Sequence, residues 1–256
     1  MVETNYGIIK HEEPQLPVIS LLRVPHRNGE LIVSYPAFGP NSYRNNIKQM
    51  QNEYFHSQTL SKITFKEPTT PESISAAAYD FENLAMPQIF NPRWLQAGRI
   101  LKTPEGVVAN PLRDAEGKVI VDSKPIRNLI DNSKKVKVGK GHIYLGENDF
   151  GFAEYDSFVQ GVQDCDSFTE GGLALILEHT EGIAQILRKI VSPKNYKRGV
   201  NIFSFDKVNE SIEKVVGLVS YRFLDYYRLF VGDVDWLGGD VGYAFGVLDS
   251  GKDFNS

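Results

Sequence analysis

Apolar and polar positions in the first third of the chain follow a strand-like spacing and then a helix-like spacing. Apolar runs at 18–24 and 31–35 flank the turn sequence Arg-Asn-Gly-Glu, whose Asn-Gly pair favours a β-hairpin because these residues accept positive φ angles. A helix follows, with Asn41 or Ser42 as its candidate N-cap. Its apolar residues share one face: Tyr43, Ile47, Met50 and Tyr54.

A second helix is predicted to begin at Thr70, because a proline at the next position and an acidic residue in the first turn suit a helix N-terminus. Its expected buried face consists of Ile74, Ala77, Ala78 and Phe81. Residues 99–155 have the composition of short strands joined by Gly- and Pro-containing turns, with one short helix near 125–131.

The most strongly periodic helix is predicted at 168–191. Arg188 and Lys189 suit its C-terminal end, and a proline two residues past Val191 ends it. Its apolar stripe consists of Leu173, Ile176, Leu177, Ile183, Leu187 and Ile190.

The sequence allows either a helix or a strand at the start of the C-terminal part of the chain. Asn209 could cap a short helix, since apolar residues at 212, 215, 216 and 219 fit a helical spacing. Alternating apolar residues and β-branched and aromatic enrichment favour a strand from about residue 218 instead. A turn at 236–241 and a closing strand at 242–248 complete the prediction. The simplest organisation is a single α+β domain over residues 1–256.

Composition and charge restrict the function classes. A net charge of −4 and a pI of about 5.8 give no general attraction to nucleic acid or anionic membranes, so neither nucleic-acid binding nor membrane insertion is expected. The one cysteine, Cys165, cannot form an internal disulfide. No apolar run resembles a signal peptide or approaches the ~20 residues of a membrane span, so we expect a soluble protein.

The most unusual composition lies at 215–251. This stretch lacks Lys, Glu, Gln and Met, which occur before it, and it is rich in Tyr, Phe, Asp, Gly and Val. A solvated surface depends on Lys and Glu, whereas a recognition surface depends on aromatic residues with small neighbours. Apart from Trp236, every residue here can be encoded by a codon that ends in a pyrimidine. Randomising the adenines of Asn codons would produce such a segment.

Two short motifs carry a family resemblance. Arg228-Leu229 and the sequence Gly-Tyr-Ala-Phe-Gly-Val at 242–247 resemble the anchors around the variable region in target proteins of diversity-generating retroelements. The resemblance implies a C-type-lectin-like fold of the formylglycine-generating-enzyme-like subtype, with short twisted antiparallel strands and flanking helices. It also implies a variable ligand-binding segment at about 215–248. The usual Gly-Gly-Ser-Trp lead-in is absent, and the N-terminal two-thirds carries no family motif.

The same stretch could instead be a set of buried core strands, which also lack Lys and Glu. The four aspartates and two arginines at 215–248 argue against full burial, because buried charges are costly unless paired. We therefore predict a surface that binds a protein ligand of no fixed identity, without cofactor or metal. Arg228, Gly242 and Phe245 are predicted to be scaffold. The predicted ligand-binding residues are Tyr221, Phe223, Asp225, Tyr226, Tyr227, Phe230, Asp233, Asp235, Trp236, Leu237 and Asp240.

An enzymatic alternative uses Cys165 and His142. A thiol at a helix N-terminus near an imidazole on a strand would resemble permuted papain-like enzymes, that is, a thiol-dependent acyl hydrolase or transferase. Asp164 and Asp166 are expected to raise the pKa of the thiol, and no third group orients the imidazole. We therefore expect a binding protein, not an enzyme. Formylglycine-generating chemistry needs two cysteines and is excluded.

Other charged motifs give weaker indications. Glu178 and Glu181 flank His179 but are expected on the solvent side of the long helix, so a metal site there is not predicted. The aspartates at 233–240 match a calcium loop poorly. Basic clusters at 134–140 and 188–198 are interpreted as charged surface. The cellular location does not follow from the sequence, although the resemblance makes surface display or virion association possible.

Overall fold

The computed structural model describes residues 17–59, 61–83, 94–221, 227–234 and 242–248. These residues form an α+β structure. Its helices are α1 Tyr43–Met50, α2 Thr70–Asn83, α3 Ser123–Asp131, α4 Cys165–Thr169, α5 Gly172–Glu178 and α6 Gln185–Val191, with a 3-10 turn at Tyr155–Ser157. Its strands are β1 Val18–His26, β2 Gly29–Tyr35, β3 Phe38–Asn41, β4 Tyr54–His56, β5 Lys62–Ile63, β6 Phe65–Lys66, β7 Trp94–Lys102, β8 Gly106–Ala109, β9 Lys134–Val138, β10 Gly141–Leu145, β11 Gly151–Glu154, β12 Gly161–Gln163, β13 Val200–Phe203, β14 Ile212–Tyr221, β15 Arg228–Val234, β16 Gly242–Ala244 and β17 Val247–Leu248.

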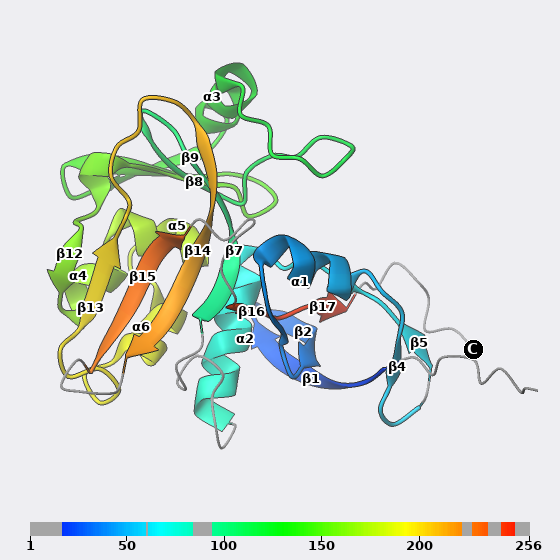
Figure 1. Cartoon of the computed structure of the whole chain (residues 1–256). Helices are drawn as coiled ribbons and strands as arrows, with labels where there is room; N and C mark the ends of the chain where they lie inside the picture. The colour runs from blue at the N-terminus through cyan, green and yellow to red at the C-terminus, as the bar shows by residue number, and fades with distance from the viewer. Residues whose placement is uncertain (1–16, 60, 84–93, 222–226, 235–241, 249–256) are drawn as a thin grey trace, which may run out of the picture.

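The strands form two sheets that share the C-terminal part of the chain (Figure 1). The small sheet has the order β5-β4-β1-β2-β17-β6. The large sheet has the order β12-β13-β15-β14-β7-β8-β11-β10-β9, with β16 pairing to both β7 and β3. Strands from the beginning and the end of the described chain are therefore neighbours in the small sheet.

Two hydrophobic clusters cover the two faces of the large sheet. The inner face carries Val216, Leu218, Leu229 and Val231, which pack with α2, α4, α5 and α6. The outer face carries Val215 and Val219, which pack with α1 and with strands of the small sheet. In Figure 1 the helices α4 and α6 lie behind β13, β15 and β14, so the outer face of these strands is turned toward the viewer.

The N-terminal predictions are confirmed with one correction. β1 and β2 form the expected hairpin, with His26 opposite Gly29. Ser42 caps α1 by accepting a hydrogen bond from the Asn45 backbone N–H at 3.4 Å. Tyr54, predicted on the face of this helix, lies in β4 instead, because α1 ends at Met50. The second helix begins at Thr70 as expected, and the short helix near 125–131 is α3.

The long helix predicted at 168–191 is wrong, because the segment forms three short helices: α4, α5 and α6. His179 adopts a left-handed conformation with φ of 54° and ends α5. Glu178, predicted on the solvent side, is 8% exposed. Its carboxylate accepts hydrogen bonds from the backbone N–H groups of Ile186, at 3.0 and 3.1 Å, and Leu187, at 2.9 Å. These donors lie in the first turn of α6, so Glu178 caps a helix that begins seven residues later in the sequence.

The C-terminal strands also differ from the prediction. β14 is a strand from Ile212 onward, so Asn209 caps no helix. The single closing strand predicted at 242–248 is two strands in two sheets, β16 and β17. The Gly246 carbonyl oxygen accepts the Ser34 backbone N–H at 2.9 Å, and the Gly246 N–H donates to the Ser34 hydroxyl at the same distance.

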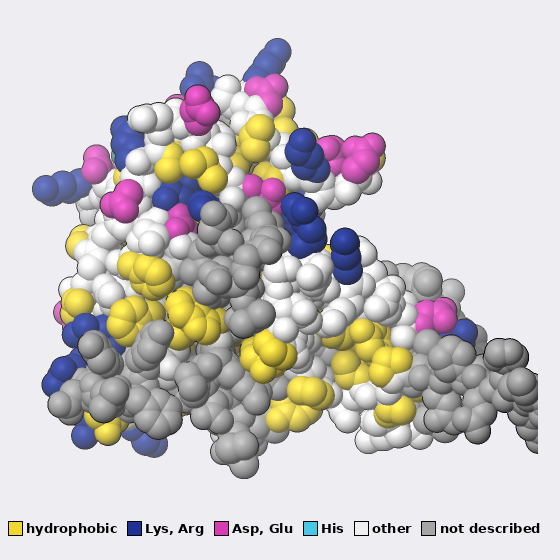
Figure 2. Space-filling model, viewed as in Figure 1, with side chains coloured by type: hydrophobic (Ala, Val, Ile, Leu, Met, Phe, Trp, Pro, Cys, Tyr) yellow, Lys and Arg dark blue, Asp and Glu magenta, His cyan; other side chains and the backbone are white. Residues whose placement is uncertain are grey.

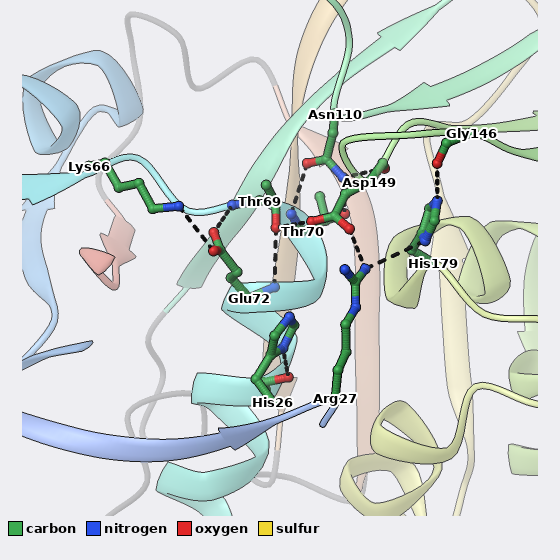
Figure 3. A network of polar contacts seen from close by, with 11 residues as sticks. His26, Arg27, Lys66, Thr69, Thr70, Glu72, Asn110, Gly146, Asp149 and His179 are labelled. Atoms are coloured by element: carbon green, nitrogen blue, oxygen red, sulfur yellow. Dashed lines mark hydrogen bonds and ion pairs between the residues drawn. The ribbon is translucent and has the colours of Figure 1, made fainter. Parts of the chain in front are cut away.

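A polar network joins the β1–β2 turn to the helical layer (Figure 3). The Arg27 guanidinium forms an ion pair with Asp149, whose side chain is 12% exposed. The other Asp149 carboxylate oxygen accepts the Thr69 hydroxyl at 2.9 Å, and the Asn110 amide donates to the Asp149 carbonyl oxygen at 2.9 Å. His179 lies beside Arg27 and contacts the Gly146 carbonyl oxygen at 2.9 Å. The hairpin tip is therefore fixed against α2 and α5.

The capping role of Glu178 gives a testable expectation. Glu178→Ala should lower the free energy of unfolding by about 1–2 kcal/mol, because two backbone donors of α6 lose their buried acceptor. Glu181→Ala is the matched control, since Glu181 makes only an exposed ion pair with Lys134 and should change stability by less than about 0.5 kcal/mol. Urea unfolding measures both variants. Equal effects would contradict the capping role.

Candidate functional site

The predicted ligand-binding residues fall into two groups. Only Tyr227, Phe230 and Asp233 have described side chains, and Tyr221 is described as the last residue of β14. The predictions for the other seven lie outside the described residues: Phe223, Asp225, Tyr226, Asp235, Trp236, Leu237 and Asp240.

Strands β14 and β15 give this segment a fixed backbone. They pair antiparallel from Tyr221↔Arg228 to Val215↔Val234. β15 also pairs parallel to β13, and β14 pairs antiparallel to β7, so both strands are interior to the large sheet. The segments 222–226 and 235–241 begin and end at residues that these ladders and β16 hold in place.

Tyr227 combines an exposed side chain with a tethered backbone. The side chain is 45% exposed, and the backbone φ of 28° is in the left-handed region. Its carbonyl oxygen accepts the Arg198 backbone N–H at 3.1 Å. The Arg228 guanidinium donates to the Arg198 carbonyl oxygen at 3.0 Å, so both residues attach the start of β15 to the segment before β13. The side chain of Tyr227 can therefore contact a ligand while its backbone keeps its position.

Phe230 belongs to an aromatic surface that sequence reasoning found only in part. Its half-buried ring meets the Phe203 ring edge to face, with centroids 6.2 Å apart. Phe203 from β13 and Trp94 from β7 were not predicted, because each is an isolated aromatic residue in its own strand. Any side chain at Gly232 would clash with the Phe203 ring. Figure 2 shows hydrophobic side chains gathered over these strands, next to residues that are not described.

Asp233 does not lie on the surface, which corrects the prediction. Its side chain is 6% exposed and forms an ion pair with Lys102, itself 7% exposed, at 2.6 Å. Lys102 also donates to the Ser204 carbonyl oxygen at 2.7 Å. Burial raises the pKa of Asp233, and the neighbouring positive charge of Lys102 opposes that shift. The sequence argument that charges exclude burial fails here because the partner cation comes from a distant strand.

The predicted scaffold residues are buried or tethered. Phe245 is 1% exposed. The Gly242 carbonyl oxygen accepts the amide of the fully buried Asn46 at 2.8 Å, and Asn46 also donates to Gln96 at 2.7 Å. A Cβ at Gly242 would press on the Gln96 side chain. Asn46 and Gln96 thus fix the point where the chain enters β16.

The thiol alternative finds little geometric support. Cys165 does begin a helix, α4, and His142 does lie on a strand, β10. Cys165 is 7% exposed in the core cluster of the inner face, whereas His142 contacts the Glu154 carboxylate at 3.2 Å. No hydrogen bond joins these two described side chains. Burial raises the pKa of the Cys165 thiol, and the Asp166 and Asp164 carboxylates raise it further, against the opposing charge of Arg188.

Within the described ranges, no three His, Cys, Asp or Glu side chains are grouped so that they could hold a metal ion. None of the helices in this part of the chain has the length and apolar character needed to cross a membrane.

Comparison with known proteins gives one similar structure. No family model matches the sequence, and no curated protein matches it. The chain is similar to a solved structure described as accommodation of massive sequence variation in Nanoarchaeota by the C-type lectin fold. The two share 16% identity, and the match covers 83% of this chain and 98% of the other, with a TM-score of 0.48.

The buried ion pair yields a stability prediction. Asp233→Ala should lower the free energy of unfolding by about 3–5 kcal/mol, because Lys102 would remain buried without its counter-ion. Replacing both partners, as Lys102→Met with Asp233→Leu, should restore most of the loss. Asp206→Ala, at an exposed aspartate, is the control. Chemical denaturation measures the stability of all three variants. An Asp233→Ala protein as stable as the control would contradict the buried ion pair and favour an exposed Asp233.

Cys165 provides a pH-dependent prediction. Because its pKa is raised in the folded protein, the thiol should react with iodoacetamide more slowly at pH 7 than in the urea-unfolded protein. As pH rises, the unfolded protein should reach its maximal alkylation rate first, since its thiolate forms at lower pH. Rates are measured by mass spectrometry. Faster alkylation of the folded protein at pH 7 would favour the thiol-enzyme reading.

Proposed function

We propose that the protein is a ligand-binding protein of the C-type-lectin type whose segment at about 215–248 presents a diversified surface to protein partners. The observation that carries the proposal is the division of β15 between its two faces. Leu229 and Val231 are fully buried on the inner face, whereas Phe230 is half-buried on the outer face and Tyr227 is exposed beside it. Phe230 packs only in part against the outer-face cluster and Tyr227 is exposed, so changes at these two positions would remove fewer core contacts than changes at Leu229 or Val231.

The backbone of the segment supports the same function. β15 lies between β13 and β14, and its main-chain hydrogen bonds do not depend on side-chain identity. Rigid elements hold contact residues more accurately than free loops do. Aromatic side chains on such a frame provide large contact areas at low conformational-entropy cost. The proposed variable positions are therefore Tyr227, Phe230 and the segments 222–226 and 235–241.

The chemistry of the surface favours binding over catalysis. Phe203 and Phe230 are in ring contact, and Trp94 lies two strands from Phe230 on the same face; all three are partly buried, and none is a nucleophile or a titratable group. Partly exposed aromatic residues are typical of the centres of protein–protein interfaces. Asp235 and Asp240 border the same segment in the sequence and would favour partners with basic or hydrogen-bond-donating surfaces. We propose a protein ligand, bound without cofactor, by one domain that spans the chain.

The proposal predicts a specific pattern in the DNA beside the gene. A near-copy of the codons for 215–248 should lie next to a reverse transcriptase gene and differ from them where the copy has adenine. The differences should fall on the codons of Tyr227, Phe230 and the two bordering segments. The codons of Leu229, Val231 and Asp233 should be identical in both copies, because their side chains are buried.

Sequencing the locus tests this pattern. Differences spread equally over the codons for buried and exposed positions would contradict the structural basis of the proposal. Absence of such a copy from the locus would rule out diversification by a retroelement. The proposal would then be reduced to a binding surface of constant sequence.

A further inference from the structure

Helix α3 lies at one end of the molecule, above the large sheet (Figure 1). α3 and the segments next to it line a cleft. It has a volume of about 670 Å³. Its walls come from α3, from the β7–β8 turn, from β11 and from the segment before β14. None of its lining residues belongs to the proposed variable segment at 215–248. Small-molecule sites commonly have volumes of about 300–1,000 Å³.

The floor of the cleft is apolar. Phe152 of β11 and Ile126 of α3 are 3% and 6% exposed, and both belong to a separate hydrophobic cluster beneath α3. Ile130 packs against the same cluster, and Val121 forms a wall that is 51% exposed. Without a ligand, Val121 and the edge of this cluster are in contact with water. A ligand with an apolar body would cover them. Removal of that apolar surface from water would favour binding.

The rim of the cleft is predominantly acidic. It carries four carboxylates and one guanidinium, those of Glu105, Asp131, Glu154, Glu210 and Arg127. Glu105, Asp131, Glu210 and Arg127 form no hydrogen bond or ion pair through their side chains with any residue that the structure describes. Three carboxylates are therefore available to a ligand, and the rim as a whole has an excess of negative charge.

Glu154 is held in a fixed position on this rim. One carboxylate oxygen accepts the backbone N–H of His142 at 2.8 Å and contacts the His142 ring at 3.2 Å. The other accepts the Tyr144 hydroxyl at 3.1 Å. Burial alone would raise the pKa of Glu154, but the hydrogen bonds from His142 and Tyr144 outweigh it and lower the pKa. These contacts hold the Glu154 carboxylate in place and favour its ionised form.

We propose that this cleft binds a small organic cation, an ammonium or guanidinium group carried on an apolar body. The body would lie against Phe152, Ile126 and Val121, and the cation would lie among the carboxylates of the rim. An anion of the same shape would meet four negative charges and one positive charge. The cleft differs from a metal site, because no three His, Cys, Asp or Glu side chains among the described residues are grouped closely enough to hold a metal ion. The proposal is independent of the variable surface.

Binding of n-hexylamine to the full chain at pH 7 tests the proposal, with n-hexanol and hexanoate as neutral and anionic probes of similar shape. Isothermal calorimetry should show saturable binding of hexylamine, weaker binding of hexanol and the weakest binding of hexanoate. Affinity for hexylamine should fall as salt concentration rises, since the rim charges are partly exposed. Hexanoate binding as tight as hexylamine would overturn the proposal, and so would an absence of saturable amine binding.

Matched charge variants locate the site. Glu105→Gln and Glu210→Gln should each weaken hexylamine binding about threefold, as expected for exposed ionic contacts, and Arg127→Gln should tighten it by a similar factor. Val121→Ser should weaken hexylamine and hexanol alike, because it removes apolar surface without changing charge. Glu116→Gln makes the same charge change on an exposed turn outside the cleft and should leave binding unchanged. All five substitutions are at exposed side chains, and circular dichroism verifies folding.

Two outcomes would reject the assignment to the cleft. An equal effect of Glu116→Gln and Glu105→Gln would mean that the amine responds only to the overall charge of the protein. Binding of a lysine-containing peptide, such as acetyl-Ala-Lys-Ala-amide, without binding of hexylamine would assign the cleft to a protein partner. Neither result would bear on the variable surface, because the substituted residues all lie outside 215–248.

Discussion

The pairing of β14 with β7 is the interaction on which the rest of the structure depends. It joins Ile212–Tyr221 to a strand that lies far earlier in the sequence, with partners from Ile212↔Lys102 to Val219↔Trp94. Regular alternation along β14 places Val216 and Leu218 on the inner face and Val215 and Val219 on the outer face. The register shift between Val216 and Gly217 is taken up on β7, where Ala97 is the extra residue. Without this ladder the helices α4–α6 would lose the surface against which they pack, and β15 would lose the frame that orients its side chains.

Two buried charge clusters stabilise this ladder from the side. Lys102 of β7 pairs with Asp233 of β15 at 2.6 Å. Arg99 of β7 pairs with Glu67 at 2.9 Å and with Glu213 of β14 at 2.7 Å. Each cluster links β7 to a C-terminal strand by side chains as well as by backbone. Such pairs contribute mainly by fixing the position of one strand relative to the other. A strand arrangement that separated the partners would leave a charge without its counter-ion in a poorly hydrated place. The register of the C-terminal strands is thus constrained by residues that lie outside the segment.

Local signals predicted local structure well and failed where a distant residue decided the outcome. The β1–β2 hairpin, Ser42 and Thr70 were identified because turn and capping chemistry depends on adjacent residues. The 168–191 helix was overpredicted because the apolar periodicity continues through the breaks at His179 and Gly182. The next helix, α6, begins where the Glu178 carboxylate accepts its first backbone N–H groups, a contact that sequence periodicity does not reveal. The missing Lys and Glu at 215–251 coincide with burial at most of the described strand positions, and the proposed recognition role concerns only the outward ones. Composition alone does not distinguish burial from recognition. It also does not reveal the Lys102–Asp233 ion pair, because the two residues are far apart in the sequence.

The edges of the large sheet restrict how a partner can approach. β9 is one edge, and its sequence Lys-Lys-Val-Lys-Val puts three lysines on a strand with an unpaired side. Charged lysines on an edge disfavour addition of a further strand, which gives the basic cluster at 134–140 a structural role without any phosphate ligand. The opposite edge, β12, is only three residues long. A partner is therefore not expected to extend the sheet. The proposed contact through a face or a loop, at outward side chains such as Tyr227, is consistent with these edges.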